Sequence, residues 1–349
     1  MALSRIANAI FILIAVEVVL SYTKTILIPL VLALMVWYLI RLLQLRMARI
    51  RVKGKQLPLW LRAMLAFGII VLILGLLSSL MVNSMRSISA VLPHYQENVL
   101  LIKGQVEELT GFDLQGKLDN MISGIDLASA VSLMLNSLTT LLSNGTLMLI
   151  YVAFIMLEER HVRFKLMSLY SDEVKRTKTM NMLRSVDASL GHYVTLKTAM
   201  SLLTGGLSYV ALLIIGVDFA FFWALVIFLL NYIPTVGSLI ATVFPALVAA
   251  LQFASYVPAL WVLGVVGAIQ MVVGNILEPR IMGNSLNVSS LVVILALSLW
   301  GSLWGIVGMI LSVPITVTMV IVMAQFPSTR WVAVLLSDKG QVDGRAEKV

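Results

Sequence analysis

Residues 219–277 read FAFFWALVIFLLNYIPTVGSLIATVFPALVAALQFASYVPALWVLGVVGAIQMVVGNIL and contain no charged side chain. A helix of roughly 20 such residues crosses a bilayer core about 30 Å thick. The whole chain agrees, because 60% of its 349 residues are hydrophobic and only 12% are charged. No soluble fold of this size buries so much apolar surface, and disorder requires the opposite composition. We therefore predict an all-α, polytopic transmembrane protein, since helices satisfy their own backbone groups in lipid.

Further apolar segments lie on both sides of this stretch. Segment 219–232 is short and is broken after Asn231 by Pro234, so 219–253 is either two crossings or one re-entrant hairpin. Segment 287–325 has the same ambiguity around Gly301 to Gly308. The count is eight to ten apolar segments, taken from about 6–22, 25–43, 60–82, 141–157, 196–216, 219–232, 237–253, 256–276, 287–303 and 304–325.

The distribution of charge predicts the topology. Residues 41–62 carry seven Lys or Arg and no acid, which the positive-inside rule assigns to the cytoplasm. Both termini are then predicted to be cytoplasmic, and the chain to be a multi-pass membrane protein. The predicted order is 1–82, N-terminal transmembrane helices with the basic loop; 83–140, an acidic amphipathic helical region on the outer side; 141–157, a transmembrane helix; 158–195, a cytoplasmic helical segment; 196–326, the C-terminal transmembrane core with the candidate site; and 327–349, a cytoplasmic tail.

Composition also excludes several classes of function. The net charge of +8 is explained by cytoplasmic loops, so we predict no nucleic-acid partner. There are no cysteines, and the three histidines lack the spacing of metal ligands. Residues 111–118 resemble a phosphate-binding loop, but Leu118 replaces the magnesium-binding Ser or Thr and no strand precedes the motif. We predict no enzyme activity, cofactor or metal.

Glu278, Pro279 and Arg280 form the first candidate translocation site, with Asn275 beside them. Pro279 ends the preceding helix and frees backbone carbonyls to line a polar site. A carboxylate and a guanidinium two residues apart can neutralise each other and still bind a polar solute. The alternative is a loop at the membrane edge in which both charges face water.

Asn231, Pro234 and Gly237 form the second candidate. The Asn231 amide before the helix break can bind a solute, and Gly237 permits close backbone approach. Helix capping or helix–helix bonding is the alternative role. Glu17, Asp218 and Glu278 are the acids beside apolar segments, which makes them candidates for proton or ion coupling.

Two parts of the C-terminal half resemble each other. Val236-Gly237 with Pro245 downstream matches Val307-Gly308 with Pro314 downstream, when a gap is allowed. This pattern is typical of inverted repeats in transporters, which hold a site between them.

Four motifs give the chain a family resemblance: GNILEPRIMG at 274–283, LNYIPTVG at 230–237, VGMILSVP at 307–314 and GHYVTLKT at 191–198. The chain resembles the autoinducer-2 exporter family of bacterial membrane proteins over about 1–337. The resemblance implies inner-membrane permeases that export autoinducer-2, a small polyhydroxylated signal in quorum sensing. It also implies homo-oligomers, a pentamer among the options, and sodium/proton antiport for some members.

The sequence therefore predicts a membrane transporter that exports a small polar organic solute, of which an autoinducer-2-like signal is the first choice. Its partners would be the lipid bilayer, the solute and further copies of itself. A cation/proton antiporter is the first alternative. The second is a membrane scaffold that does not transport and docks partners on its outer helical region or on residues 172–195.

Overall fold

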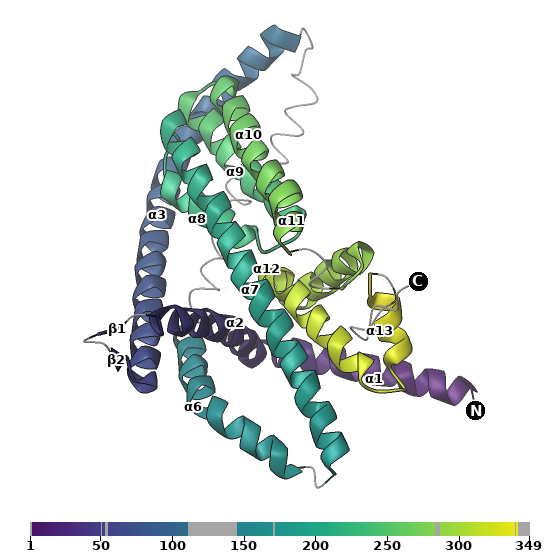
Figure 1. Cartoon of the computed structure of the whole chain (residues 1–349). Coiled ribbons are helices and arrows are strands. Elements are labelled where there is room, and N and C mark those ends of the chain that lie inside the picture. The colour runs from purple at the N-terminus through teal and green to yellow at the C-terminus, as the bar shows by residue number, and fades with distance from the viewer. Residues whose placement is uncertain are drawn as a thin grey trace. The chain divides into compact units, whose positions relative to one another are not determined.

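The computed structural model describes residues 2–49, 51–52, 55–110, 145–169, 172–282, 287–338 and 340. These residues are mainly helical (Figure 1), apart from a minimal hairpin of β1 (Arg51–Val52) and β2 (Lys55–Gln56). The helices are α1 (Ala2–Tyr22), α2 (Lys24–Met47), α3 (Leu59–Thr110), α6 (Gly145–Leu169), α7 (Glu173–Ile215), α8 (Ala220–Leu230), α9 (Val236–Phe253), α10 (Tyr256–Gln270), the π-helix η1 (Met271–Leu277), α11 (Glu278–Met282), α12 (Ser290–Ala324) and α13 (Arg330–Leu336).

The predicted fold class is confirmed, with fewer membrane helices than the eight to ten expected. Among the described residues, six helical segments are long and apolar enough to cross a membrane: α2, Leu59–Ile88 of α3, α7, α9, the continuous run Tyr256–Ile281, and α12. The count falls because α8 has only 11 residues and because two predicted segments merge into α12. The predicted spans 6–22 and 141–157, which fall on α1 and α6, are not among the six.

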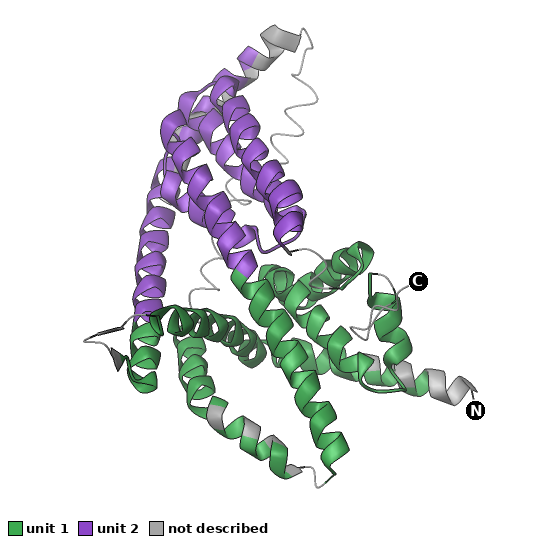
Figure 2. Ribbon diagram, viewed as in Figure 1, with its two compact units in different colours: residues 1–68, 144–195, 284–349 green, residues 69–143, 196–283 purple. Residues whose placement is uncertain are grey.

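The chain forms two compact units (Figure 2). Unit 1 comprises residues 1–68, 144–195 and 284–349, and unit 2 comprises residues 69–143 and 196–283. The long helices α3 and α7 contribute residues to both units.

In unit 2, α8 and α9 form a helical hairpin. The limbs approach so closely at Gly237 that a Cβ there would overlap the Leu230 carbonyl oxygen. Eleven helical residues extend only about 16 Å, roughly half of the bilayer core, so α8 is too short for a crossing. Its partner α9, with 18 residues, is long enough to cross, so re-entry of the whole segment 219–253 stays a prediction.

The second half of α3 packs on the same unit beyond its apolar part. Asp218 lies between α7 and α8, and its carboxylate accepts a hydrogen bond from the Tyr95 hydroxyl at 2.6 Å. The side-chain amides of Asn98 and Gln105 donate to the carbonyls of Leu251 and Ala254, where α9 ends. Residues 83–110 of the predicted outer region thus belong to α3, whereas 111–140, and residues 141–144 of the predicted fourth span, lie outside the described residues.

In unit 1, α2 is joined to α6 and to the first half of α7 by polar contacts. Arg41 donates to both Asp187 carboxylate oxygens, at 2.7 and 2.9 Å. The Trp37 indole donates to Glu159 at 3.2 Å. The Tyr38 ring lies against Gly191, where an added Cβ would be 3.5 Å from it. These contacts connect helices that are far apart in the sequence.

A sharp turn at Gly305 divides α12 into two limbs. Gly305 has φ 63° and ψ −144°, a conformation that suits a residue without a Cβ. Beyond it, a Cβ at Gly308 would overlap the Trp300 carbonyl oxygen and lie 3.0 Å from the Trp304 Cβ. Gly237 meets the carbonyl of Leu230 and the Cβ of Ile233 in the same way, also at 3.0 Å for the Cβ. The sequence likeness between the two glycine segments therefore has a structural counterpart in each unit.

Candidate functional site

A buried ion pair in unit 2 connects two of the quoted motifs. The Lys197 Nζ of α7 lies 2.5 Å from the Glu278 Oε1 of α11, and the two side chains are only 6% and 17% exposed. Sequence reading had paired Glu278 with Arg280, which instead is exposed. Burial of two charges requires close pairing, because each loses its hydration. The pair is therefore a built feature of the interior of unit 2.

Lys197 is the residue that sequence reasoning missed. It is separated from Glu278 by 81 residues, so spacing along the sequence does not suggest the pair. Its spacing could have identified it: Lys197 lies four residues before Ser201, which places both on the same face of α7, and that face is buried.

A π-helix leads directly into Glu278. Across η1, the Glu278 amide donates to the Val273 carbonyl, five residues back. The next bond of this five-residue spacing would run from residue 279 to the Gly274 carbonyl. Residue 279 is a proline without an N–H, so this bond cannot form. Single-turn π segments inside helices occur frequently at functional sites. Asn275 is exposed on the same π-helix, as are Pro279 and Arg280 just beyond it.

Asn231 lies at the tip of the α8–α9 hairpin and is buried. Its amide donates to the Ser201 hydroxyl of α7 at 3.0 Å. Next to this pair, the Thr198 and Tyr232 hydroxyls are 2.6 Å apart. Pro234 and Thr235, which has a positive φ of 58°, form the turn that leads into Gly237. The second predicted site is therefore brought to α7, within two helical turns of Lys197.

A further buried polar pair joins α9 to α10. The Gln270 amide donates to the Thr242 hydroxyl at 2.7 Å, and both residues are buried. Sequence reading did not single out either residue, since one amide or hydroxyl in an apolar segment is common. Among the described residues of unit 2, polar pairs that are wholly or partly buried therefore join different helical segments at Lys197–Glu278, Asn231–Ser201, Thr198–Tyr232 and Gln270–Thr242.

The other two acids proposed for ion coupling are placed differently. Asp218 is exposed and accepts from Tyr95, while its backbone amide donates to the Gln252 side chain at 2.7 Å. Burial first, and then the Asp218 carboxylate, raise the pKa of Tyr95 above its ordinary value of 10.0. Glu17 is exposed on α1 in unit 1. Neither acid is brought to the Lys197–Glu278 pair by the contacts of its own unit.

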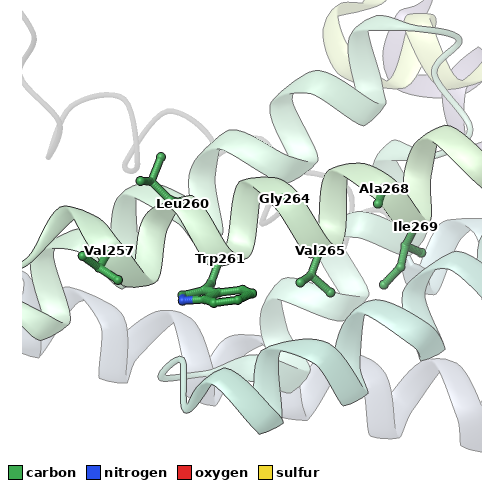
Figure 3. Close-up of a pocket in the computed structure, with 7 residues that line it drawn as sticks. All are labelled: Val257, Leu260, Trp261, Gly264, Val265, Ala268 and Ile269. Carbon is green, nitrogen blue, oxygen red and sulfur yellow. The ribbon is translucent and has the colours of Figure 1, made fainter.

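An apolar groove runs along α10 and does not coincide with these pairs (Figure 3). Its lining comes from one helix: Val257, Leu260, Trp261, Gly264, Val265, Ala268 and Ile269. None of the sequence-predicted site residues is among them. A groove of this chemistry suits hydrocarbon rather than a hydroxylated solute. Over the part of the chain that the structure describes, no three His, Asp or Glu residues are arranged to hold a metal ion.

Comparison with known proteins supplies the family. The profile of the AI-2E family of transporters matches residues 9–328. The chain belongs to the AI-2E transporter family. It is therefore a multi-pass bacterial membrane transporter, in agreement with its apolar helices.

Individual relatives agree with this membership of the AI-2E family. The AI-2 transport protein TqsA of Escherichia coli is 35% identical over 323 residues, which cover 91% of each chain. A putative transport protein of Haemophilus influenzae is 33% identical over 298 residues, covering 81% of this chain and 83% of the relative. The putative transport protein YhhT of Escherichia coli is 30% identical over 291 residues, covering 81% of both. The resemblance that the sequence motifs suggested is confirmed.

Proposed function

We propose that this transporter exports autoinducer-2, or a closely related small hydroxylated solute, across the inner membrane. The observation that carries the proposal is the 35% identity to the AI-2 transport protein TqsA over 91% of both chains. The buried polar pairs of unit 2 support it chemically, because amide and hydroxyl groups bind a hydroxylated solute. We infer no enzyme activity, since membership of a transporter family explains the chain.

Depth along α7 supports a translocation role for these pairs. Counted from Ile215 at the end of α7, Ser201 lies about 21 Å and Lys197 about 27 Å along the helix axis. A bilayer core is about 30 Å thick, so the Asn231–Ser201 pair would lie inside it and the Lys197–Glu278 pair near its other edge. Polar groups at these depths cost free energy, so their presence in membrane helices points to a function.

In this proposal the solute bonds to Asn231, Asn275 and the Glu278 carboxylate with its Lys197 partner. Arg280, exposed beside them, attracts the solute at the entrance. Pro234, Gly237 and Pro279 shape the helix breaks that bring these groups together. The basic loop 41–62 then faces the cytoplasm with both termini, and residues 83–110 face outward. Copies of the chain assemble into a homo-oligomer.

Export of autoinducer-2 from proteoliposomes tests the proposal, with and without a sodium or proton gradient. The wild type should show flux, and Asn231→Ala and Glu278→Gln should lower it at least tenfold while protein insertion is unchanged. Glu173→Gln is the matched control, because Glu173 is an exposed carboxylate at the start of α7. Absence of flux in the wild type under every gradient would overturn the proposal.

A cation/proton antiporter is the second candidate, and one observation favours it. The Glu278 carboxylate and the Gly274 carbonyl, to which Pro279 cannot donate a hydrogen bond, are oxygen groups of the kind that bind sodium. This function predicts a sodium-dependent change of internal pH in vesicles containing a pH dye, abolished by Glu278→Gln. The two assays share the same variant, so the same preparation decides between the functions.

A further inference from the structure

One face of α7 carries a buried line of polar side chains. Lys197, Ser201, Thr204 and Ser208 follow each other at intervals of four, three and four residues, which places them on one face of a helix. All four are buried, at 5%, 0%, 1% and 0% exposure. The line extends about 16 Å along the helix axis. Inside a membrane protein each such group needs a partner, because no water replaces the bond.

Three members of the line have partners, and the fourth has none. Lys197 pairs with Glu278, Ser201 accepts from Asn231, and the Thr204 hydroxyl donates to the Met200 carbonyl at 2.9 Å. The Ser208 Oγ is buried without a hydrogen-bond partner among the described residues. The indole Nε1 of Trp223 on α8 is likewise buried without a hydrogen-bond partner among the described residues.

The packing of α7 on α8 places these two groups at the same level. Ser201 contacts Asn231, a Cβ at Gly205 would be 3.0 Å from the Ala224 carbonyl oxygen, and the Tyr209 and Phe221 rings are 6.0 Å apart. The register is therefore antiparallel and regular. It sets Ser208, between Gly205 and Tyr209, opposite the turn of α8 that carries Trp223.

Aromatic rings fix the Trp223 side chain in this position. The indole stacks on the Phe244 ring of α9 at 6.4 Å with an interplanar angle of 12°, and the Phe222 ring meets it edge-on at 5.1 Å. The indole is also completely buried. A buried donor that is held in place without a partner lowers the stability of the fold, and a ligand that accepts from it removes this cost.

We propose that Ser208 Oγ and Trp223 Nε1 form a second binding station for the solute, which binds one of its hydroxyl groups. A solute hydroxyl can accept from the indole N–H and donate to the serine oxygen, so both orphaned groups are satisfied at once. A metal cation cannot accept from an N–H, so the station does not suit a metal cation. It lies about 10 Å along α7 from the Asn231–Ser201 pair. This inference rests on the proposed export of a hydroxylated solute.

Transport kinetics and stability test the station together. Ser208→Ala and Trp223→Phe should each raise the KM for autoinducer-2 about fivefold to tenfold, the worth of one hydrogen bond. Ser208→Ala should also leave thermal stability unchanged or higher, because it removes an unsatisfied buried group. Ser298→Ala and Trp261→Phe are matched controls: Ser298 already bonds to the Ile294 carbonyl, and Trp261 is exposed. An unchanged KM, or a Ser208→Ala variant of lower stability, overturns the inference.

Cysteine labelling separates this inference from the proposed function. The chain has no native cysteine, so Ser208→Cys carries the only thiol. A small thiol reagent should modify this cysteine, and autoinducer-2 should slow the reaction. Gly206→Cys is the control, since Gly206 is exposed and has open space around it. No labelling at position 208 overturns the station. Labelling there without any autoinducer-2 flux in the wild type overturns the proposed solute but supports access to the station.

Discussion

Alanine at Gly237 should destabilise the α8–α9 hairpin strongly, although glycine-to-alanine changes inside helices usually stabilise. A Cβ at this position would overlap the Leu230 carbonyl oxygen, and it would lie 2.9 Å from the Leu230 carbonyl carbon and 3.0 Å from the Ile233 Cβ. The overlapping atom belongs to the backbone, so no side chain can rotate away. The two limbs of the hairpin must therefore separate.

The expected cost is about 3 kcal/mol, the upper end of the range for overpacked sites. Gly206→Ala is the matched control on α7, where nothing lies within 4 Å of the added carbon. There the higher helix propensity of alanine should stabilise by about 0.5–1 kcal/mol. The two identical chemical changes in unit 2 should thus have effects of opposite sign.

Thermal unfolding of the purified protein in detergent, followed by the loss of monodisperse protein, measures both variants. We expect the midpoint of Gly237→Ala to fall by roughly 6–10 °C and that of Gly206→Ala to stay or rise. Export should also be lost in Gly237→Ala, because Asn231 lies at the hairpin tip. Equal midpoints for the two variants would refute the close approach at Gly237, and with it the packing of α8 against α9 as described.

Three further predictions concern ion pairs and the α3 contacts. Lys197→Met should lower the free energy of unfolding by about 3–5 kcal/mol, because it leaves the Glu278 carboxylate largely buried and unpaired. The double variant Lys197→Met with Glu278→Leu should lose less than Lys197→Met alone. Thermal unfolding of the double variant and of both single variants measures this, and losses that add up would contradict it. Asp187→Asn should lower the free energy of unfolding by less than about 1 kcal/mol, because the side chains of Arg41 and Asp187 are 40% and 41% exposed and water screens the pair. A loss of stability as large as that of Lys197→Met would contradict this. Tyr95→Phe removes a hydrogen bond to a carboxylate and should lose about 1.5–3 kcal/mol. The pKa of Tyr95 is raised above 10.0 in the folded protein, so the stabilisation by its hydroxyl is complete below pH 10 and is lost as the pH rises further. The difference in unfolding free energy between wild type and Tyr95→Phe should therefore be constant from pH 6 to 9 and shrink above pH 10.

The fold class was predictable because it depends on composition and on local runs of sequence. The uncharged stretch 219–277 can be stable only in lipid, whatever its neighbours. The break at Pro234 was also predictable, because proline acts on its own helix. The close packing of α8 against α9 was not, since it depends on how far α8 continues and on the contact between Gly237 and Leu230.

The candidate site was half predictable for the same reason. Asn231 and Glu278 were identified because a polar group in an apolar segment is visible in the sequence. Their partners Ser201 and Lys197 are 30 and 81 residues away, and nothing in the local pattern gives such pairings. The pairing of Glu278 with Arg280 seemed natural from spacing alone, but Arg280 is exposed while Lys197 is buried.

The sequence by itself determined that this chain is a helical membrane protein of the AI-2E transporter family, because hydrophobic length and short motifs are properties of contiguous residues. Only the tertiary structure decided which polar groups meet inside unit 2. Desolvation is the physical reason: a buried charge or hydroxyl must find a partner wherever the packing of helices provides one. The same packing leaves Ser208 and Trp223 without a partner among the described residues, which no reading of the sequence could have shown.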